Sequence, residues 1–155
     1  MSFSAKTKLL TTGFEVTAFV QNQYREVQTL QGSNISLQND MTKTVKATIT
    51  KNNFPQQMIK ITTVKKNVII VSPDQGMYVV DGYGLAGFAY KIIEAQNCAD
   101  QRLIRPYWWL PYSSLQFPNE AVEKVELTDY MDSYAVVSPG VLAIVAEGFV
   151  VSTNN

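Results

Sequence analysis

A strict alternation of apolar and polar residues is the feature that most limits how this chain can fold. In the segment 43–50, Val45, Ala47 and Ile49 occupy every second position, with lysine or threonine between them. Successive side chains of a strand point to opposite faces, so this pattern predicts a half-buried β-strand. Similar patterns predict strands at 14–20, 27–30, 59–64, 68–71, 77–80, 103–104, 134–137 and 141–151.

Turn sequences separate these strands, and few segments favour helix. The segments 65–67, 73–76 and 138–140 carry the Asn, Asp, Pro and Gly residues that turns prefer. Apolar spacing predicts one helix at 85–95, and a capping Asn119 followed by acids predicts another at 120–129. The sequence therefore predicts a mainly β fold: one domain over 1–155, an antiparallel sandwich or barrel with one or two short helices. Loose ends are expected at 1–5 and 152–155.

Histidine is absent and cysteine occurs once, at Cys98. This excludes Ser-His-Asp and Cys-His catalysis and zinc sites built on Cys and His. The sequence therefore predicts no catalytic residue, no metal ligand, no cofactor and no enzymatic activity. A lone cysteine cannot form an internal disulfide, and neither a signal peptide nor a membrane-spanning run is recognisable. Folding in a reducing cytoplasm is expected.

A glycine fingerprint, Gly82-Tyr-Gly84-Leu-Ala-Gly87, raises the alternative of a dinucleotide-binding loop. Such a loop needs a strand before it and a helix after it, inside a run of alternating strands and helices. Here it follows a long stretch of β pattern without a helix. Asp81-Gly82 is also a common turn dipeptide. A structural use of the glycines is therefore favoured over cofactor binding.

An aromatic segment, Pro106-Tyr-Trp-Trp-Leu-Pro-Tyr112, contains both tryptophans of the chain. Its prolines rule out a continuous helix or a central strand, so an extended loop is predicted. Tyr107, Trp108, Trp109 and Tyr112 are candidate contact residues. Large aromatic side chains of this kind suit a protein interface, and they also suit a glycan site or, less well, a membrane surface.

Charge is unevenly distributed although the net charge is zero. Residues 1–66 carry nine basic groups and three acids, whereas residues 67–155 carry four basic groups and ten acids. Either these are two solvated faces, or a basic surface meets an acidic one on a neighbouring protein. The candidate contact residues are Lys43, Lys46, Lys51, Lys65 and Lys66 on one side, and Glu120, Glu123, Glu126 and Asp129 on the other.

These features together predict a non-enzymatic structural subunit that assembles with itself or with other structural proteins. Amide side chains are numerous, with 21 Asn and Gln, and only 17% of residues are charged, so neighbouring copies repel one another weakly. The favoured class is a virion component of a tailed phage (a decoration, neck, tail or fibre-attachment protein), assembled in the host cytoplasm. The alternatives are a glycan-binding module using residues 106–112 and, less favoured, a dinucleotide-binding protein using residues 82–87. No nucleic-acid partner is expected.

Overall fold

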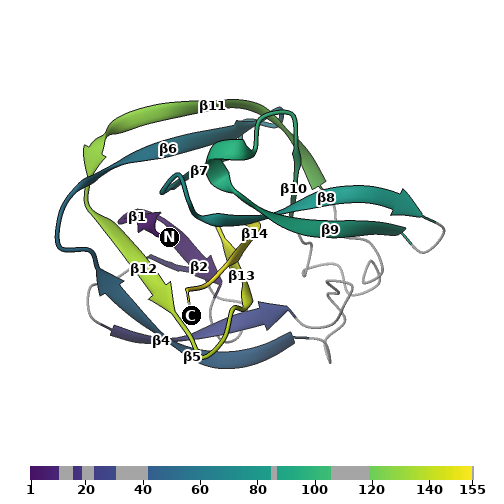
Figure 1. Ribbon diagram of the computed structural model, residues 1–155. Coiled ribbons are helices and arrows are strands. Elements are labelled where there is room, and N and C mark those ends of the chain that lie inside the picture. Colours follow the sequence, from purple (N-terminus) through teal and green to yellow (C-terminus); the bar gives the residue numbers. More distant parts are fainter. Residues whose placement is uncertain (11–15, 19–22, 31–41, 85–86, 106–118, 155) are drawn as a thin grey trace.

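A computed structural model describes residues 1–10, 16–18, 23–30, 42–84, 87–105 and 119–154. These residues form strands and one short 3₁₀ turn, η3 (Ala95–Asn97) (Figure 1). The strands are β1 (Phe3–Ser4), β2 (Lys8–Leu10), β3 (Val16–Ala18), β4 (Gln23–Leu30), β5 (Thr42–Lys51), β6 (Gln56–Thr63), β7 (Val68–Val71), β8 (Gly76–Gly84), β9 (Gly87–Glu94), β10 (Arg102–Ile104), β11 (Asn119–Met131), β12 (Ser133–Val137), β13 (Ala143–Ala146) and β14 (Phe149–Ser152). The mainly β prediction is confirmed.

The strands pair in one antiparallel sheet that is not closed into a barrel. Its order is β14-β8-β10-β11-β6-β7-β1-β12-β5-β4-β13-β2-β3, with β9 paired to β8 and β13 also paired to β14. The long β6–β11 ladder arches over one end of the molecule, and the β4–β5 hairpin lies at the opposite end (Figure 1). Strands distant in sequence are therefore brought together around the short strands formed by the two chain ends.

Both helix predictions are wrong. Residues 87–94 form β9, which pairs with β8 from Gly84↔Gly87 to Gly76↔Glu94, and residues 119–131 form β11. β11 pairs with β6, whose Ile59 and Ile61 are buried. Cross-strand pairing with such β-branched, buried neighbours outweighs the modest helix propensity of an acidic segment. A 3.6-residue apolar spacing over a few residues does not by itself separate helix from strand.

The core is a continuous cluster of aliphatic side chains from most of the strands. Phe3, Ile61, Met77 and Phe149 are among its largest fully buried members. Cys98 lies in the same cluster, and burial raises the pKa of its thiol to about 12. The cluster includes residues from the first and last strands, so core packing holds both ends of the chain.

The described residues of the segments expected to be loose lie in the sheet or directly beside it. β1 pairs with both β7 and β12, and β14 pairs with β8 and β13. Ser2 and Thr153 are essentially buried. Apolar Phe3 and Val151, at 1% and 0% exposure, stabilise these short strands by packing into the core. Within the described residues, no helix has the length and hydropathy needed to cross a membrane.

Candidate site where the chain ends meet

The connection between β7 and β8 is a turn with the sequence Ser72-Pro73-Asp74-Gln75. The Gln75 amide donates to the Ser72 carbonyl (3.1 Å), which closes the turn. The segment that follows β9 supports it: the Ala95 amide donates to the Gln75 carbonyl (2.8 Å) and the Gln96 amide to the Pro73 carbonyl (2.9 Å). The turn is thus held in a fixed conformation, with its polar side chains available to other segments.

The N-terminal residues dock onto this turn. The Ser2 amide donates to Ser72 Oγ (2.8 Å), and the Ser72 amide donates to the Ser2 carbonyl (2.9 Å). The Ser2 hydroxyl accepts a hydrogen bond from Gln56 Nε2 at the start of β6. Ser2 is 1% exposed, so these contacts form away from bulk water. The backbone amide and the backbone carbonyl of Ser2 are therefore both held in place by hydrogen bonds to Ser72.

The C-terminal residues reach the same place, and the marks for the two ends lie close together in Figure 1. Asn154 Nδ2 donates to the Met1 carbonyl oxygen at 2.9 Å. The Asn154 backbone is fixed by two hydrogen bonds, to Val136 (2.8 Å) and from Ser138 (2.9 Å). The carbonyl of the Met1–Ser2 peptide is consequently bound by one end segment while its nitrogen is bound by the β7–β8 turn.

Gln75 lies beneath this arrangement and is fully buried. Its Nε2 donates to the Ser152 carbonyl (2.7 Å) and the Gly76 carbonyl (3.1 Å), which connects the turn to β14. Its Oε1 has no hydrogen-bond partner among the residues that the structure describes. Gly76 permits the close approach of the two strands, because a β-carbon at this position would overlap with Ser152 Oγ.

Asp74 carries the negative charge of the site. Its Oδ1 accepts from Ser72 Oγ (2.7 Å) and its Oδ2 from the Met1 ammonium (3.2 Å). Partial burial raises the pKa of Asp74, but the Ser72 hydrogen bond and the ammonium charge outweigh it and hold the pKa below its ordinary value. Because an ionised carboxylate only accepts hydrogen bonds, the Ser72 hydroxyl must point its proton toward Asp74. Its lone pairs then face the Ser2 amide.

This geometry suits acyl transfer at the Met1–Ser2 peptide. A hydroxyl nucleophile adjoins the bond, a donor binds the carbonyl oxygen, and an acceptor binds the nitrogen. Donors placed on a carbonyl oxygen stabilise the charge that develops there during attack. Within the described part of the chain, His, Cys, Asp and Glu form no cluster that could hold a metal ion.

The glycine fingerprint forms a hairpin. Gly82 and Gly84 pair with β9 residues Ala89 and Gly87, and a register shift between Val80 and Gly82 marks a bulge at Asp81 where a turn was expected. The strand–helix junction that presents helix amides to a pyrophosphate is not formed here, because a strand follows the glycines. In the described residues, these glycines lie in the paired strands β8 and β9.

The predicted charged contact residues have different positions. Glu120 is buried, at 3% exposure, where it accepts from Thr63 Oγ1 (2.7 Å) and Asn67 Nδ2 (2.8 Å) and pairs with Arg105 Nε (3.3 Å). It therefore cannot serve an exposed acidic surface. Lys66 pairs with Glu123 in the same chain (2.6 Å), and this contact lowers the pKa of Glu123.

The other candidate contact residues remain predictions. Lys51 pairs with Asp132 (3.3 Å), whereas Lys65, Glu126 and Asp129 are exposed. Lys43 and Lys46 lie in β5. Tyr107, Trp108, Trp109 and Tyr112, and with them the glycan-binding alternative, fall outside the described residues.

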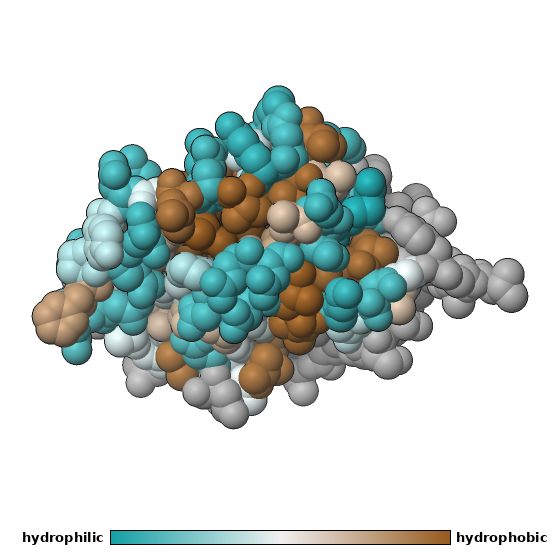
Figure 2. All heavy atoms as spheres, turned by 45° about the horizontal axis from the view of Figure 1, so that its top comes forward, coloured by the Kyte–Doolittle hydropathy of each residue, from teal (hydrophilic) through white to brown (hydrophobic). Residues whose placement is uncertain are grey.

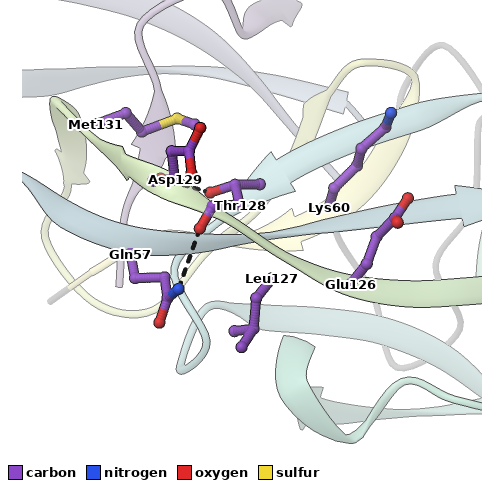
Figure 3. A pocket seen from close by; sticks show the side chains of 7 residues that line it. All are labelled: Gln57, Lys60, Glu126, Leu127, Thr128, Asp129 and Met131. Carbon is purple, nitrogen blue, oxygen red and sulfur yellow. Dashed lines mark hydrogen bonds between the residues drawn. The ribbon is translucent and has the colours of Figure 1, made fainter.

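A second, open depression lies on the β6–β11 ladder (Figure 3). It measures about 590 Å³ and is lined by Gln57, Lys60, Glu126, Leu127, Thr128, Asp129 and Met131. The same ladder exposes Leu127 and Tyr130, and Figure 2 shows apolar surface among polar side chains on the face turned forward. None of the residues that line it belongs to the two end segments of the chain.

Comparison with solved structures identifies the architecture. The chain resembles the DnaB intein from Synechocystis sp. PCC 6803 (TM-score 0.70, 10% identity, 99% of each chain covered). It also resembles the KlbA intein precursor from Methanococcus jannaschii (TM-score 0.70, 14% identity, 99% of this chain and 91% of that one). This chain has the fold of the inteins. A bacterial intein-like domain from Clostridium thermocellum matches as well (TM-score 0.60, 16% identity, 99% and 98% covered).

The intein fold corrects several predictions. The predictions of a phage virion component, of a virion location and of a chain without enzymatic activity are wrong, because solved structures that match 99% of this chain include inteins, which catalyse protein splicing. No protein-family model and no curated protein sequence matches the chain.

Sequence reasoning missed every residue of the site. The sequence patterns place Ser2 and Asn154 in loose ends and Asp74 and Gln75 in a turn, and they assign no role to Ser72. The available signal was polar residues directly flanking short apolar strands at both ends, in Ser2-Phe3-Ser4 and Val151-Ser152-Thr153-Asn154.

Proposed function

We propose that this chain is an intein-like self-processing domain that acts in cis on the peptide bond between residue 1 and Ser2, at its junction with a preceding segment. The observation that carries the proposal is the hydrogen bond from Asn154 to the Met1 carbonyl, at a peptide whose nitrogen is bound by Ser72. Two ends that are 153 residues apart thereby meet at one polarised peptide bond. The fold shared with inteins supports the same function.

The proposed reaction is an acyl shift. Ser2 Oγ forms a bond to the carbonyl carbon of residue 1, the carbon–nitrogen bond of that peptide breaks, and the hydroxyl proton ends on the Ser2 nitrogen. The product is an ester on the Ser2 side chain and a free amine on Ser2. Water then hydrolyses the ester and releases the preceding segment, or a nucleophile from a following segment takes the acyl group and the two segments are joined.

The residues of the site contribute mainly by positioning. Asn154 stabilises the negative charge that develops on the carbonyl oxygen, and Gln56 orients the attacking hydroxyl. An intramolecular attack of this kind avoids the entropy of bringing two molecules together, an advantage of up to ~10⁵–10⁸ M in effective concentration. Because the chain has no histidine, the usual general base is missing, and we expect the self-processing reaction to be slow.

The test places the chain between two reporter proteins of different mass and keeps Met1 as residue 1. Incubation of the purified precursor should give a break between Met1 and Ser2, located by intact mass, and hydroxylamine should accelerate it because it cleaves esters. Ser2→Ala should abolish the reaction. Ser4→Ala is the matched control, because Ser4 is also buried but bonds to Thr7. A precursor that stays intact for days, with or without hydroxylamine, would refute the proposal.

A further inference from the structure

The contacts of Asp74 place a carboxylate next to the proposed reaction without touching the atoms that react. Its two oxygens bridge the Met1 nitrogen and the Ser72 hydroxyl. The Ser72 hydroxyl in turn accepts from the Ser2 amide. A continuous chain of hydrogen bonds, 2.8 Å and then 2.7 Å long, therefore leads from the leaving nitrogen to a negative charge.

Building on the proposed function, we infer that Asp74 is a positioning residue that acts through Ser72 on the nitrogen leaving the Met1–Ser2 bond. An amide nitrogen leaves as an amine only after it has gained a proton, so positive charge develops there. Ser72 keeps its lone pairs toward this nitrogen because its own proton is committed to Asp74. The Asp74 carboxylate thus holds the Ser72 hydroxyl in this orientation, and its negative charge stabilises the positive charge that develops on the nitrogen.

A preceding segment strengthens this role. When residue 1 is joined to a preceding residue, its nitrogen is a neutral amide, and the ammonium that now lies 3.2 Å from Asp74 Oδ2 is gone. The carboxylate then keeps its hydrogen bond from Ser72 and faces the leaving nitrogen through that hydroxyl, while its exposed side remains in water. The arrangement therefore favours the product of the acyl shift, in which the Ser2 nitrogen is a free amine that takes a further proton from water to become an ammonium.

A double-mutant cycle in the fused precursor tests this inference. Asp74→Asn keeps the shape of the side chain and an oxygen that accepts from Ser72, but removes the charge. Ser72→Ala removes the connecting hydroxyl. Each single variant should slow the break at Met1–Ser2 at least about tenfold, which is less than the roughly 10²–10⁴-fold typical of a general acid or base because neither residue transfers the proton itself. The double variant should react within about threefold of the slower single variant, because the hydrogen bonds that connect Asp74 to the leaving nitrogen in the described residues run through Ser72.

The outcomes separate the two proposals. A wild-type precursor that does not react defeats the proposed function and this inference with it. A reactive wild type with an Asp74→Asn rate within threefold of it defeats this inference alone. So does a double variant whose loss equals the product of the single losses, since that result means Asp74 acts independently of Ser72. Thermal melts of all four proteins verify that the rates belong to folded chains, and a loss of rate explained by unfolding overturns the inference as well.

Discussion

Replacing Glu120 by Ala should be among the most destabilising single changes to a polar residue of this sheet. Glu120 lies at the start of β11 and is 3% exposed. Its carboxylate accepts hydrogen bonds from Thr63 and Asn67 and pairs with Arg105. These three residues belong to β6, to the β6–β7 turn and to the position directly after β10, so one side chain connects three segments.

The magnitude follows from what the substitution leaves behind. Removing one partner of a buried ion pair costs about 3–5 kcal/mol, because the other charge stays buried without compensation. Thr63 and Asn67 also lose a charged acceptor, but these losses overlap with the first and do not simply add. Arg105 keeps its hydrogen bond to the Glu147 carbonyl (3.1 Å) and is partly exposed, which limits the cost. We expect about 3–4 kcal/mol, a large part of the roughly 5–15 kcal/mol typical of a domain.

Urea unfolding followed by far-ultraviolet circular dichroism measures this cost. The matched control is Glu126→Ala on the same strand, where the carboxylate is exposed and pairs with Lys124 at 3.4 Å. Such a pair contributes about 0–1 kcal/mol. The two variants should share the wild-type urea slope and differ in midpoint. A loss below about 1 kcal/mol for Glu120→Ala, or equal losses for both variants, would refute the reasoning that the Glu120 network is buried and structural.

Two further predictions concern the packing around the chain ends and the core. Gly76→Ala should destabilise the fold by about 1–3 kcal/mol, because its β-carbon meets Ser152 Oγ; adding Ser152→Ala should recover part of the loss in urea unfolding, and no recovery would contradict the steric explanation. Cys98 should resist a thiol reagent at pH 8 in the native chain, since it is fully buried with a pKa raised to about 12, and should react fully in urea; rapid native labelling would show that the thiol is accessible.

The sequence predicts the strands well where each strand lies within one local pattern. The alternation at 43–50 corresponds to β5, and the segments at 59–64 and 68–71 correspond to β6 and β7. The predicted long strand at 141–151 is instead the hairpin of β13 and β14, whose turn has Glu147 and Gly148 at φ 51° and 80°. Glycine at such a turn was present as a signal, but the uninterrupted apolar pattern on either side concealed it.

The division of charge along the chain also follows from the topology. β6 pairs with β11, and β5 pairs with β12, so the basic N-terminal half lies against the acidic C-terminal half. Lys66 meets Glu123 and Lys51 meets Asp132 across these boundaries. Part of the charge complementarity that the sequence predicts between two proteins is therefore satisfied by ion pairs within this chain. Contacts of the remaining lysines with a partner stay a prediction.

The site itself could not be derived from local patterns, because its contacts join distant positions. The hydrogen bond from Ser2 to Ser72 spans 70 residues, that from Gln75 to Ser152 spans 77, and that from Asn154 to Met1 spans 153. Local sequence predicts whether a segment is a helix or a strand. Contacts between distant residues depend instead on the order in which the strands pair, and no residue near either end determines that order alone. The same dependence gives the site its function: the end segments carry too few apolar residues to fold independently, so the peptide bond between residue 1 and Ser2 becomes polarised only when the whole sheet has assembled around it.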